Sequence, residues 1–523
     1  MGTGLEVALR KISSVNPATG EVLRELEAAS ESEAYAAVAR ARSAQASWAA
    51  IGVRKRIVIL REFQRRLHER KLEIAEAITR EAGKPVAEAL TTEVLVVLDA
   101  ARFLIDNAYR LLRDESVPHG NLATKLKRGL LVREPYGVVG IISPWNYPFS
   151  IPATETLAAL IAGNAVVLKP SEFTSLVALE LRSLLHAAGV PADIFQVVVG
   201  DGATGAALIH SPIDKLVFTG SVATGKRIAT VAADRLLPVV LELGGKDPML
   251  VLDDADIDVA SSAAVWGAFM NAGQTCLSVE RCYVHRGVYE EFLKACAAKT
   301  KRLRVGRGLD PATDVGPMIR DQQIRIVEAH IEDAVARGAR VLVGGSRLPE
   351  LGRNFFKPTV LAGVTHEMRI MREETFGPVL PVATFNSDDE ALRLANDSEF
   401  GLAASVWTRD AAGGERLARR IQAGTVMVND VISCFGISEA PHGGVKSSGI
   451  GRAHGRLGLE EMVRLKYLDV DLTPGMKKVW WYGYGQNSAR QMEGFLDMQF
   501  ARRLRARLRG AVLAAGVIRR KPL

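Results

Sequence analysis

The sequence predicts an α/β protein with two separate, mostly parallel β-sheets. Three observations support this fold class. Residues from about 30 to 115 show apolar spacing near 3.6 residues, which is typical of helices. From about residue 129, short apolar runs alternate with helical stretches, as they do in βαβ units. The chain has 523 residues, and at roughly 100–200 residues per domain this length allows two to four domains.

The first group of elements begins with helices and continues into a sheet. Helical periodicity covers Glu31–Ala50 and Arg54–Gly83, and a further helix is expected from about 153 to 162. The apolar runs between these stretches are continuous, which indicates strands buried on both faces. The expected strands are 129–137, 137–143, 164–170, 195–199, 216–219 and 238–243.

A second group of strands follows residue 276 and predicts a second α/β domain. Its expected strands are 282–285, 340–343, 358–361, 379–385 and 425–429. The sequence contains no internal repeat.

Composition indicates an ordinary globular protein in a reducing compartment. Hydrophobic residues make up 48% and charged residues 24% of the chain. The four cysteines, Cys276, Cys282, Cys296 and Cys434, form no Cys-x-x-Cys pair, so we expect neither a zinc site nor a disulfide framework. The first ten residues lack the apolar core of a signal peptide. The apolar run 511–518 is far shorter than the roughly 20 residues of a membrane span.

The net charge of +8 is concentrated at the C-terminus. Eleven Lys or Arg and two acidic residues lie from Lys477 onward, so the remaining chain is almost neutral and no nucleic-acid partner is expected. A basic amphipathic helix is predicted from about 488 to 515. Its apolar stripe recurs every four residues: Leu496, Phe500, Leu504, Leu508 and Val512. Such a helix suits an anionic membrane surface, or it packs on its own or a neighbouring subunit, for example over the substrate entrance, and the sequence leaves these interpretations open.

Glu242 and Cys276 form the most informative pair of residues. A thiol attacks a carbonyl as thiolate, and a free cysteine is mostly protonated near neutral pH. A carboxylate that reaches the thiol, or the water that follows it, supplies the missing base. Glycines lie close to both residues, so the backbone can approach a ligand.

Two glycine-rich segments follow predicted strands and open helices. The segment Gly200-Asp-Gly202-Ala-Thr-Gly205 matches Gly-x-Gly-x-x-Gly, but a tight turn is the favoured interpretation because no placed acidic residue follows. The segment from Phe218 through Gly220 and Ser221 to Gly225 is the better dinucleotide candidate, since a helix N-terminus favours a phosphate.

Polar residues also follow two buried strands, at the sheet edge where ligands bind in parallel folds. Lys169, Ser171 and Glu172 lie in one such segment. A carboxylate there can accept ribose hydroxyls and repels a 2′-phosphate, which favours NAD over NADP, although NADP is still allowed. Asn146, next to Trp145, offers a neutral amide that can stabilise an oxyanion.

The loops that contain Glu374, Phe376 and His442 are read as turns, and His442 as a loop histidine. No His, Asp or Glu cluster suggests a metal.

These motifs together resemble the aldehyde dehydrogenase superfamily, from about residue 10 to 471. They are Pro-Trp-Asn-Tyr-Pro, Lys-Pro-Ser-Glu, Phe-Thr-Gly-Ser, the Glu242–Cys276 segment and Glu-x-Phe-Gly-Pro, in family order. The presence of Glu242 argues against the CoA-acylating branch.

The resemblance implies a role for each motif residue. Cys276 is the expected nucleophile, Asn146 and the Cys276 backbone N–H the oxyanion hole, and Glu242 the base that activates water for thioester hydrolysis. Hydride would pass to the nicotinamide of NAD. The expected cofactor-binding residues are Trp145, Lys169, Ser171, Glu172, Gly202, Phe218, Gly220, Ser221, Gly225, Leu243, Glu374 and Phe376.

The resemblance also implies an architecture and partners. The expected parts are a Rossmann-like NAD-binding domain at 1–117 and 136–244, a catalytic domain at 245–444, an oligomerisation hairpin at 118–135 and 459–471, and a basic extension at 472–523. A homodimer or homotetramer in the cytoplasm follows by analogy. The basic extension also resembles that of fatty-aldehyde members of the family, which reaches the bilayer.

Thr275, Leu277 and Thr154 depart from the common family pattern and are expected to shape the aldehyde pocket. Thr154 stands where many members carry a large aromatic, which indicates a wider pocket. We expect a medium or long aliphatic aldehyde, or an aromatic one. The alternatives are a semialdehyde dehydrogenase, which needs a cationic anchor, and a non-catalytic scaffold on the same fold.

Overall fold

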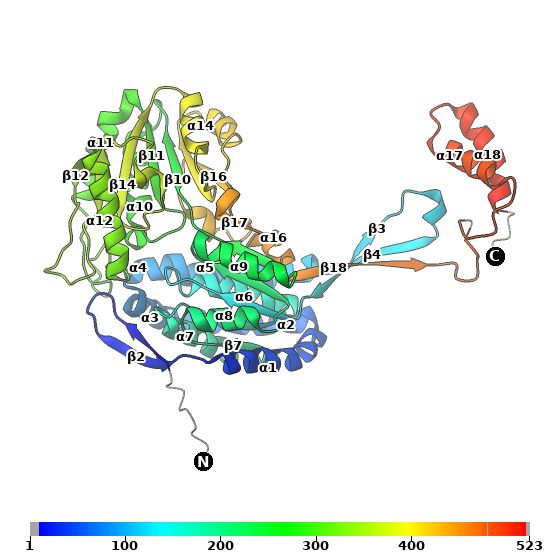
Figure 1. The fold of residues 1–523 in the computed structure, drawn as a ribbon, viewed down its shortest axis with the longest axis horizontal. Coiled ribbons are helices and arrows are strands. Elements are labelled where there is room, and N and C mark those ends of the chain that lie inside the picture. Colours follow the sequence, from blue (N-terminus) through cyan, green and yellow to red (C-terminus); the bar gives the residue numbers. More distant parts are fainter. Residues whose placement is uncertain (1–9, 479, 519–523) are drawn as a thin grey trace, which may run out of the picture. The chain divides into compact units, whose positions relative to one another are not determined.

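The computed structural model describes residues 10–478 and 480–518 and divides the chain into two compact units (Figure 1). The main unit comprises Met1–Leu111 and Pro135–Val463, and the C-terminal unit comprises Leu112–Glu134 and Arg464–Leu523. Residues 1–9, which carry most of the segment searched for a signal peptide, and Val479 lie outside the described residues.

The first sheet of the main unit has six strands in the order β17-β9-β8-β5-β6-β7, and only β17 runs antiparallel to its neighbour. Every residue of β5 and β6 is buried, as their apolar runs predict. The strands are β5 (Val138–Ile142), β6 (Ala165–Lys169), β7 (Phe195–Val197), β8 (Lys215–Thr219), β9 (Val239–Glu242) and β17 (Gly449–Ile450).

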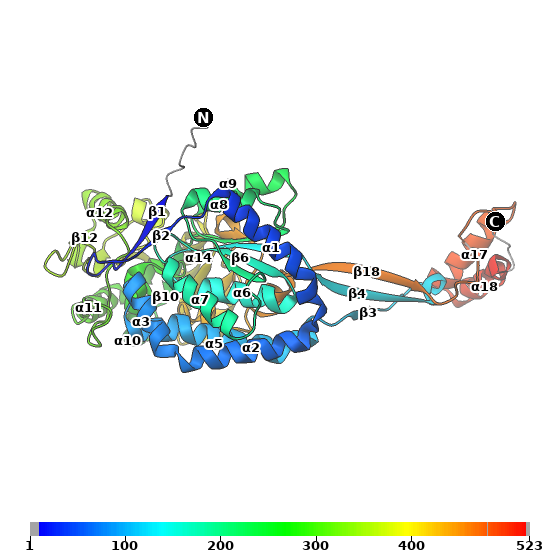
Figure 2. The ribbon, with the colours of Figure 1, turned by 90° about the horizontal axis from the view of Figure 1, so that it is seen from below.

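Helices connect successive strands of this sheet and cover it. The connecting helices are α6 (Ser150–Ala162), α7 (Ser175–Ala187), α8 (Gly202–His210) and α9 (Val222–Asp234). The preceding helices are α1 (Glu31–Ala50), α2 (Gly52–Glu69), α3 (Lys71–Ala82), α4 (Val86–Ala89) and α5 (Leu95–Leu111), and Figure 2 shows α2 beside α5. A capping box of Ser30 and Glu33 starts α1 at the predicted residue.

The helix predicted over 54–83 is two helices, because Arg70 leaves the helical conformation (φ −97°, ψ 13°) between α2 and α3. A π-helical turn, Leu90–Val94, joins α4 to α5. It carries Glu93, whose side chain is fully buried.

The second sheet has seven strands in the order β12-β13-β14-β11-β10-β15-β16, and only β12 is antiparallel. The strands are β10 (Asp247–Val251), β11 (Val279–His285), β12 (Arg340–Val343), β13 (Thr359–Ala362), β14 (Val379–Phe385), β15 (Ala403–Trp407) and β16 (Thr425–Val428). Around it lie α10 (Ile257–Phe269), α11 (Tyr289–Thr300), α12 (Asp321–Ala336), α13 (Arg369–Arg372), α14 (Asp388–Asn396) and α15 (Ala411–Ala418), whereas α16 (Gly455–Glu460) packs on α5 and α6 beside the first sheet. Two mostly parallel sheets confirm the predicted fold class.

Five strands of the main unit were not anticipated from sequence: β1 (Lys11–Val15), β2 (Val22–Glu27), β10, β15 and the two-residue β17. Strands β10 and β15 are both fully buried parts of the second sheet, and β10 pairs with β15 in parallel. Strands β1 and β2 form an N-terminal antiparallel hairpin. Most of their residues are exposed or partly exposed, and apolar and polar residues alternate only weakly along them.

The C-terminal unit contains a three-stranded sheet and a helical hairpin. The sheet order is β18-β4-β3, with β3 (Glu115–Val117), β4 (Lys127–Pro135) and β18 (Val463–Asp471) (Figure 1). The single helix predicted over 488–515 is wrong. Helix α17 (Ser488–Phe500) ends at Ala501, which is extended (φ −62°, ψ 137°), and α18 begins at Leu504 and ends at Ile518.

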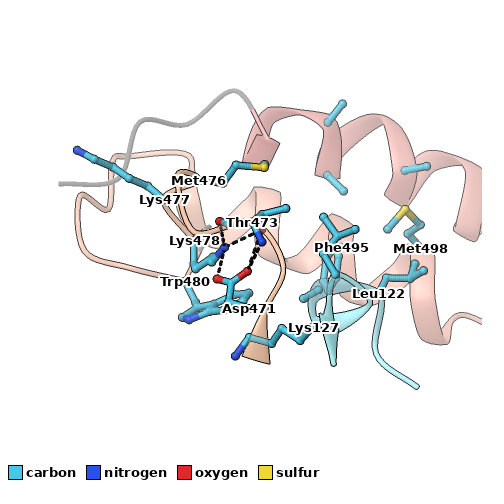
Figure 3. Close-up of a pocket in the computed structure, with 15 residues that line it drawn as sticks. Leu122, Lys127, Asp471, Thr473, Met476, Lys477, Lys478, Trp480, Phe495 and Met498 are labelled. Atoms are coloured by element: carbon cyan, nitrogen blue, oxygen red, sulfur yellow. Dashed lines mark hydrogen bonds and ion pairs between the residues drawn. The ribbon is translucent and has the colours of Figure 1, made fainter. Parts of the chain in front are cut away.

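A cavity of about 480 Å³ lies within the C-terminal unit (Figure 3). Its walls are mostly apolar and include Leu122, Met476, Trp480, Phe495 and Met498. At its edge the Lys478 ammonium pairs with Asp471 and donates to the Thr473 hydroxyl at 2.9 Å. In the part of the chain that the structure describes, every helix falls short of the length or apolar character that crossing a bilayer requires.

Candidate active site

Cys276 sits on a constrained turn between α10 and β11. Asn271, Ala272 and Gly273 have φ values of 52°, 53° and 72°. A side chain at Gly273 would meet the Gly377 carbonyl oxygen at 2.2 Å, so only glycine fits this close approach. A Cβ at Gly245 would likewise meet the Cys276 carbonyl oxygen at 2.4 Å. The turn therefore holds the Cys276 backbone tightly against two neighbouring loops.

Three cavities of the main unit include Cys276 in their walls. The apolar cavity, of about 260 Å³, is lined by Thr91, Thr92, Val96, Tyr147, Ile151, Trp266, Met270, Thr275, Cys276, Leu277, Ile432, Ser433, Phe435 and Gly436. The cleft, also about 260 Å³, is lined by Pro144, Trp145, Asn146, Ile151, Thr219, Gly220, Ser221, Glu242, Leu243, Gly244, Cys276, Arg320, Gln323, Ile326, Glu374 and Phe376. The polar chamber, of about 30 Å³ and named for its carboxyl and imidazole groups, is lined by Ile151, Thr154, Glu155, Thr219, Glu242, Leu243, Cys276, Leu402, Phe435, His442, Ala453 and His454.

The three residues that depart from the common family pattern, Thr154, Thr275 and Leu277, line different cavities next to Cys276. Thr275 and Leu277 line the apolar cavity, and the Thr275 hydroxyl lies 2.7 Å from the Tyr147 hydroxyl. Thr154 instead lines the polar chamber, so its small side chain adds room there and not in the apolar cavity.

Glu242, at the carboxyl end of β9, lies between the cleft and the polar chamber. Its carboxylate is buried, and neither oxygen has a hydrogen-bond partner among the described residues. Burial, and then the nearby Glu155, raises the pKa of Glu242 well above its ordinary value. Burial, and then nearby carboxylates, also raises the pKa of the Cys276 thiol. Because a thiol attacks as thiolate, the first step requires a proton acceptor.

A buried ion pair positions the loop that contains Asn146. The Lys84 ammonium lies 2.7 Å from the Glu93 carboxylate, and both side chains are fully buried. Lys84 also donates to the Asn146 carbonyl at 2.7 Å, and Glu93 accepts from the backbone N–H groups of Phe149 (2.9 Å) and Ser150 (2.8 Å). The pair thus satisfies backbone groups at both ends of the loop.

The Asn146 side chain is oriented by the turn that precedes Cys276. Its amide nitrogen donates to the Gln274 carbonyl at 3.0 Å, and the Asn271 amide donates to the Asn146 carbonyl at 3.0 Å. An amide nitrogen has two hydrogens, so one N–H of Asn146 is left for an oxyanion. The structure brings Asn146, Glu242 and Cys276 together at one cleft.

Half of the expected cofactor residues line the cleft: Trp145, Gly220, Ser221, Leu243, Glu374 and Phe376. The Trp145 and Phe376 rings meet edge to face at 5.5 Å. Glu374 accepts from the Gly245 N–H at 3.2 Å. A second buried pair, Lys246–Glu280, supports this loop, since Glu280 accepts from the N–H groups of Thr375 and Phe376, both at 2.8 Å.

The other expected cofactor residues lie outside the cleft wall. Lys169, Ser171 and Glu172 follow β6, and the Lys169 ammonium lies 3.6 Å from the Glu172 carboxylate. Phe218 and Gly225 act through contacts with cleft residues. A Cβ at Gly220 would meet the Phe218 ring at 2.6 Å, and one at Gly225 would meet Leu243 at 2.5 Å.

Gly202 begins α8, whose N-terminus already holds a carboxylate. Asp201 accepts from the N–H groups of Ala203 (3.0 Å) and Thr204 (3.4 Å) and pairs with Arg10 at 2.9 Å. This negative charge disfavours a phosphate there, in line with the favoured interpretation of that segment as a turn. The start of α9 at Ser221, which opens into the cleft, is the better place for a phosphate.

Several residues of the site were not anticipated from sequence, and no local signal identified them. Lys84, Glu93, Lys246 and Glu280 are ordinary charged residues whose pairing appears only in three dimensions. His442 does lie in a loop, but the loop buries it against the polar chamber. Among the described residues, no group of three or more His, Cys, Asp or Glu side chains could hold a metal ion.

Comparison with known proteins identifies close relatives. A model of the aldehyde dehydrogenase family matches residues 6–468. The chain is 41% identical to 4,4′-diapolycopene aldehyde oxidase of Methylomonas sp, over 93% of this chain and 91% of the relative. It is 38% identical to a mitochondrial succinate-semialdehyde dehydrogenase of Oryza sativa subsp. japonica, over 88% and 86%. The NAD⁺ complex of an aldehyde dehydrogenase from Bacillus cereus superimposes with a TM-score of 0.85 at 36% identity, over 88% and 94%.

Lys84→Met removes the cation and leaves the Glu93 carboxylate buried without its ion-pair partner. Because breaking a buried pair in this way costs about 3–5 kcal/mol, we expect a clearly lower midpoint of thermal unfolding, measured by calorimetry. Glu69→Gln, which breaks the exposed Arg65–Glu69 pair, is the control and should leave the midpoint nearly unchanged. Equal midpoints for the two variants would contradict the role given to Lys84.

Proposed function

This chain belongs to the aldehyde dehydrogenase family, and from that premise we propose that it oxidises an apolar aldehyde through a thioester on Cys276. The apolar cavity that ends at Cys276 is the main support for an apolar substrate. No described residue in its wall carries a charged side chain. A methylene chain or an aromatic ring is favoured in such a wall because its burial releases water from apolar surface.

The first step of the proposed reaction forms a bond between sulfur and carbon. Once the Cys276 thiol has released its proton to water in the cleft, the thiolate attacks the aldehyde carbon, and the new oxyanion accepts from the Asn146 amide and the Cys276 backbone N–H. The product is a thiohemiacetal. The hydrogen bond from Asn146 to Gln274 fixes the amide before substrate arrives, so no reorganisation is needed.

The second step leaves a thioester, and the third hydrolyses it. The family uses NAD or NADP, and the nicotinamide supplies a hydride acceptor when it is bound in the cleft. Glu242 then removes a proton from water as the water oxygen bonds to the thioester carbon. The carbon–sulfur bond breaks, the carboxylic acid leaves, and Cys276 is regenerated.

The residues around the cleft fit a dinucleotide and favour NAD. The N-terminus of α9 at Ser221 offers backbone donors to a phosphate, and Glu374 offers a carboxylate to a ribose. Glu172, beside Lys169, can accept from the hydroxyls of the second ribose. Its negative charge would repel the 2′-phosphate of NADP.

Semialdehyde oxidation is the alternative, since a relative named for it is 38% identical. The terminal carboxylate of such a substrate would need a cation deep in the cavity. Arg320 is a candidate cation, but its side chain lines the cleft and not the apolar cavity. Its guanidinium stacks on the Phe173 ring at 4.8 Å. The apolar wall therefore favours a substrate without a second charge.

We also propose two partners for the C-terminal unit. Strand β18 is an edge strand, and residues 464–470 are exposed along it, so a second copy of the chain can pair there to form a homo-oligomer. Helices α17 and α18 leave the predicted apolar stripe exposed: Leu496, Phe500, Leu504, Leu508 and Val512 are each more than half accessible. Arg502, Arg505 and Arg509 are exposed beside it.

Exposed apolar and cationic side chains on the α17–α18 helix pair suit an anionic lipid surface. Apolar side chains enter the headgroup region, and each nearby Lys or Arg adds about 1 kcal/mol of attraction. We therefore propose peripheral contact of this unit with a membrane.

The substrate proposal predicts that kcat/KM for straight-chain aldehydes rises with chain length. A buried methylene contributes about 0.8 kcal/mol, so each added carbon should raise kcat/KM by roughly fourfold until the cavity is full. The measurement is NADH formation from acetaldehyde to dodecanal, with succinic semialdehyde as the charged comparison and Cys276→Ala as the inactive control. Preference for succinic semialdehyde would overturn the apolar assignment, and turnover by Cys276→Ala would overturn the mechanism.

The membrane proposal predicts that the full chain sediments with vesicles of anionic phospholipid and is released by high salt. The double variant Leu508→Glu, Val512→Glu should sediment less, and Leu72→Glu, a change at an equally exposed leucine of α3, should not. Absence of vesicle binding would contradict the proposal. A change in oligomer size by light scattering, caused by the double variant alone, would assign the surface to a second copy instead.

A further inference from the structure

Unpartnered polar atoms gather at the polar chamber behind Cys276. Among the described residues, both carboxylate oxygens of Glu242, one oxygen of Glu155 and both ring nitrogens of His454 are buried without a hydrogen-bond partner. All three side chains line this one chamber. Buried polar groups are normally satisfied, so a cluster of unsatisfied ones calls for an explanation.

The chamber has the size and enough polar groups among its apolar neighbours to hold an internal water. Its volume of about 30 Å³ exceeds the roughly 10–15 Å³ that one water requires. Carboxylate, imidazole and hydroxyl groups face it, which provides the two to four partners that such a water normally has. A water here would bridge Glu242 to the groups opposite.

The strand register places Glu155 close to Glu242. Thr219 of β8 pairs with Glu242 of β9, and the Thr219 hydroxyl donates to the Glu155 carboxylate at 3.0 Å. Thr219 also lines the cleft, so it connects Glu155 to the open side of the site. Glu155, on α6, is buried and takes no part in the reaction steps above.

Two neutral imidazoles complete the wall. The His442 Nε2 lies 3.9 Å from the Glu242 carboxylate, and the His442 and His454 rings are 5.9 Å apart. Burial lowers the pKa of His442 to about 3 and that of His454 to about 4. A neutral imidazole has one donor and one acceptor nitrogen, so each ring can accept and pass on a hydrogen bond.

The charged and titratable groups that face Glu242 come from four neighbouring segments: Glu155, His442, the residues Arg452 and His454 of one loop, and Glu461. The two glutamates raise the pKa of Glu242, and Arg452 lowers it. Two carboxylates in one dry space cannot both ionise readily. Burial raises the pKa of Glu155 to about 8, so below that pH Glu155 holds a proton.

We propose that Glu155, the two histidines and an internal water form a proton-transfer site that serves Glu242. The inference deepens the proposed function and rests on it. During hydrolysis a proton moves from the attacking water to Glu242. Glu155 releases its proton through Thr219 to the cleft, and the proton on Glu242 crosses the chamber water to Glu155. Glu242 is then a carboxylate again and Glu155 an acid, so no other reactant is needed.

Glu155→Gln tests this role, because glutamine keeps the shape but cannot release the proton. Stopped-flow NADH formation should show a burst of about one equivalent per site at the wild-type rate. The steady-state rate, limited by hydrolysis, should fall at least tenfold, since positioned proton transfer contributes about 10²–10⁴-fold. The pH at which the steady-state rate is half maximal should move down, because Glu242 no longer faces a second carboxylate. Glu155→Asp should restore part of the rate.

Two further variants separate proton transfer from structural damage. His454→Asn, which tolerates the left-handed φ of 57°, should also slow the steady state and spare the burst. Glu81→Gln alters a carboxyl that is equally buried but remote from all three cavities, and should change neither the burst nor the pH profile. Parallel loss of burst and steady state in Glu155→Gln, or an unchanged profile, would overturn the inference. Absence of an acyl-enzyme in the wild type would instead overturn the proposed function.

Discussion

The buried Lys84–Glu93 pair is the interaction on which the site depends. The loop from Ser143 to Phe149 carries Asn146 into the interior, where its backbone polar groups lose water. Lys84 and Glu93 supply the missing partners through three hydrogen bonds. Glu93 lies on a π-helical turn, and such turns occur often at functional sites. Lys246 and Glu280 form a second buried ion pair, and Glu280 accepts a hydrogen bond from the backbone N–H of Phe376.

Rigid loops and a dry interior explain how ordinary residues become reactive. Burial raises the pKa of both Cys276 and Glu242 above their ordinary values, so both hold a proton more strongly than they would in water. Fixed donors such as the Asn146 amide are already in place for the oxyanion that develops during attack. Each cavity at Cys276 then has one task in the account: the apolar cavity holds the aldehyde, the cleft holds the dinucleotide, and the polar chamber handles protons.

The alternation of apolar runs and helical stretches predicts the two sheets, and the family resemblance of the motifs implies that Asn146, Glu242 and Cys276 meet at one site. The sequence does not predict the buried pairs, since the contact of Lys84 with Asn146 spans 62 positions. The chamber was missed because burial of His442 depends on how its loop packs. The C-terminal helix was predicted as one element because apolar spacing continues through the extended residue Ala501. Periodicity records which positions are apolar and contains no information about a local change in ψ.

The most direct test of the central claim is to trap the acyl group on Cys276. The Glu242→Gln variant, mixed with NAD and octanal and quenched in acid, can be digested and analysed by mass spectrometry. The account predicts an octanoyl group on the peptide that contains Cys276, formed only when NAD is present. An acyl group on another residue, or none while NADH is produced, would contradict it.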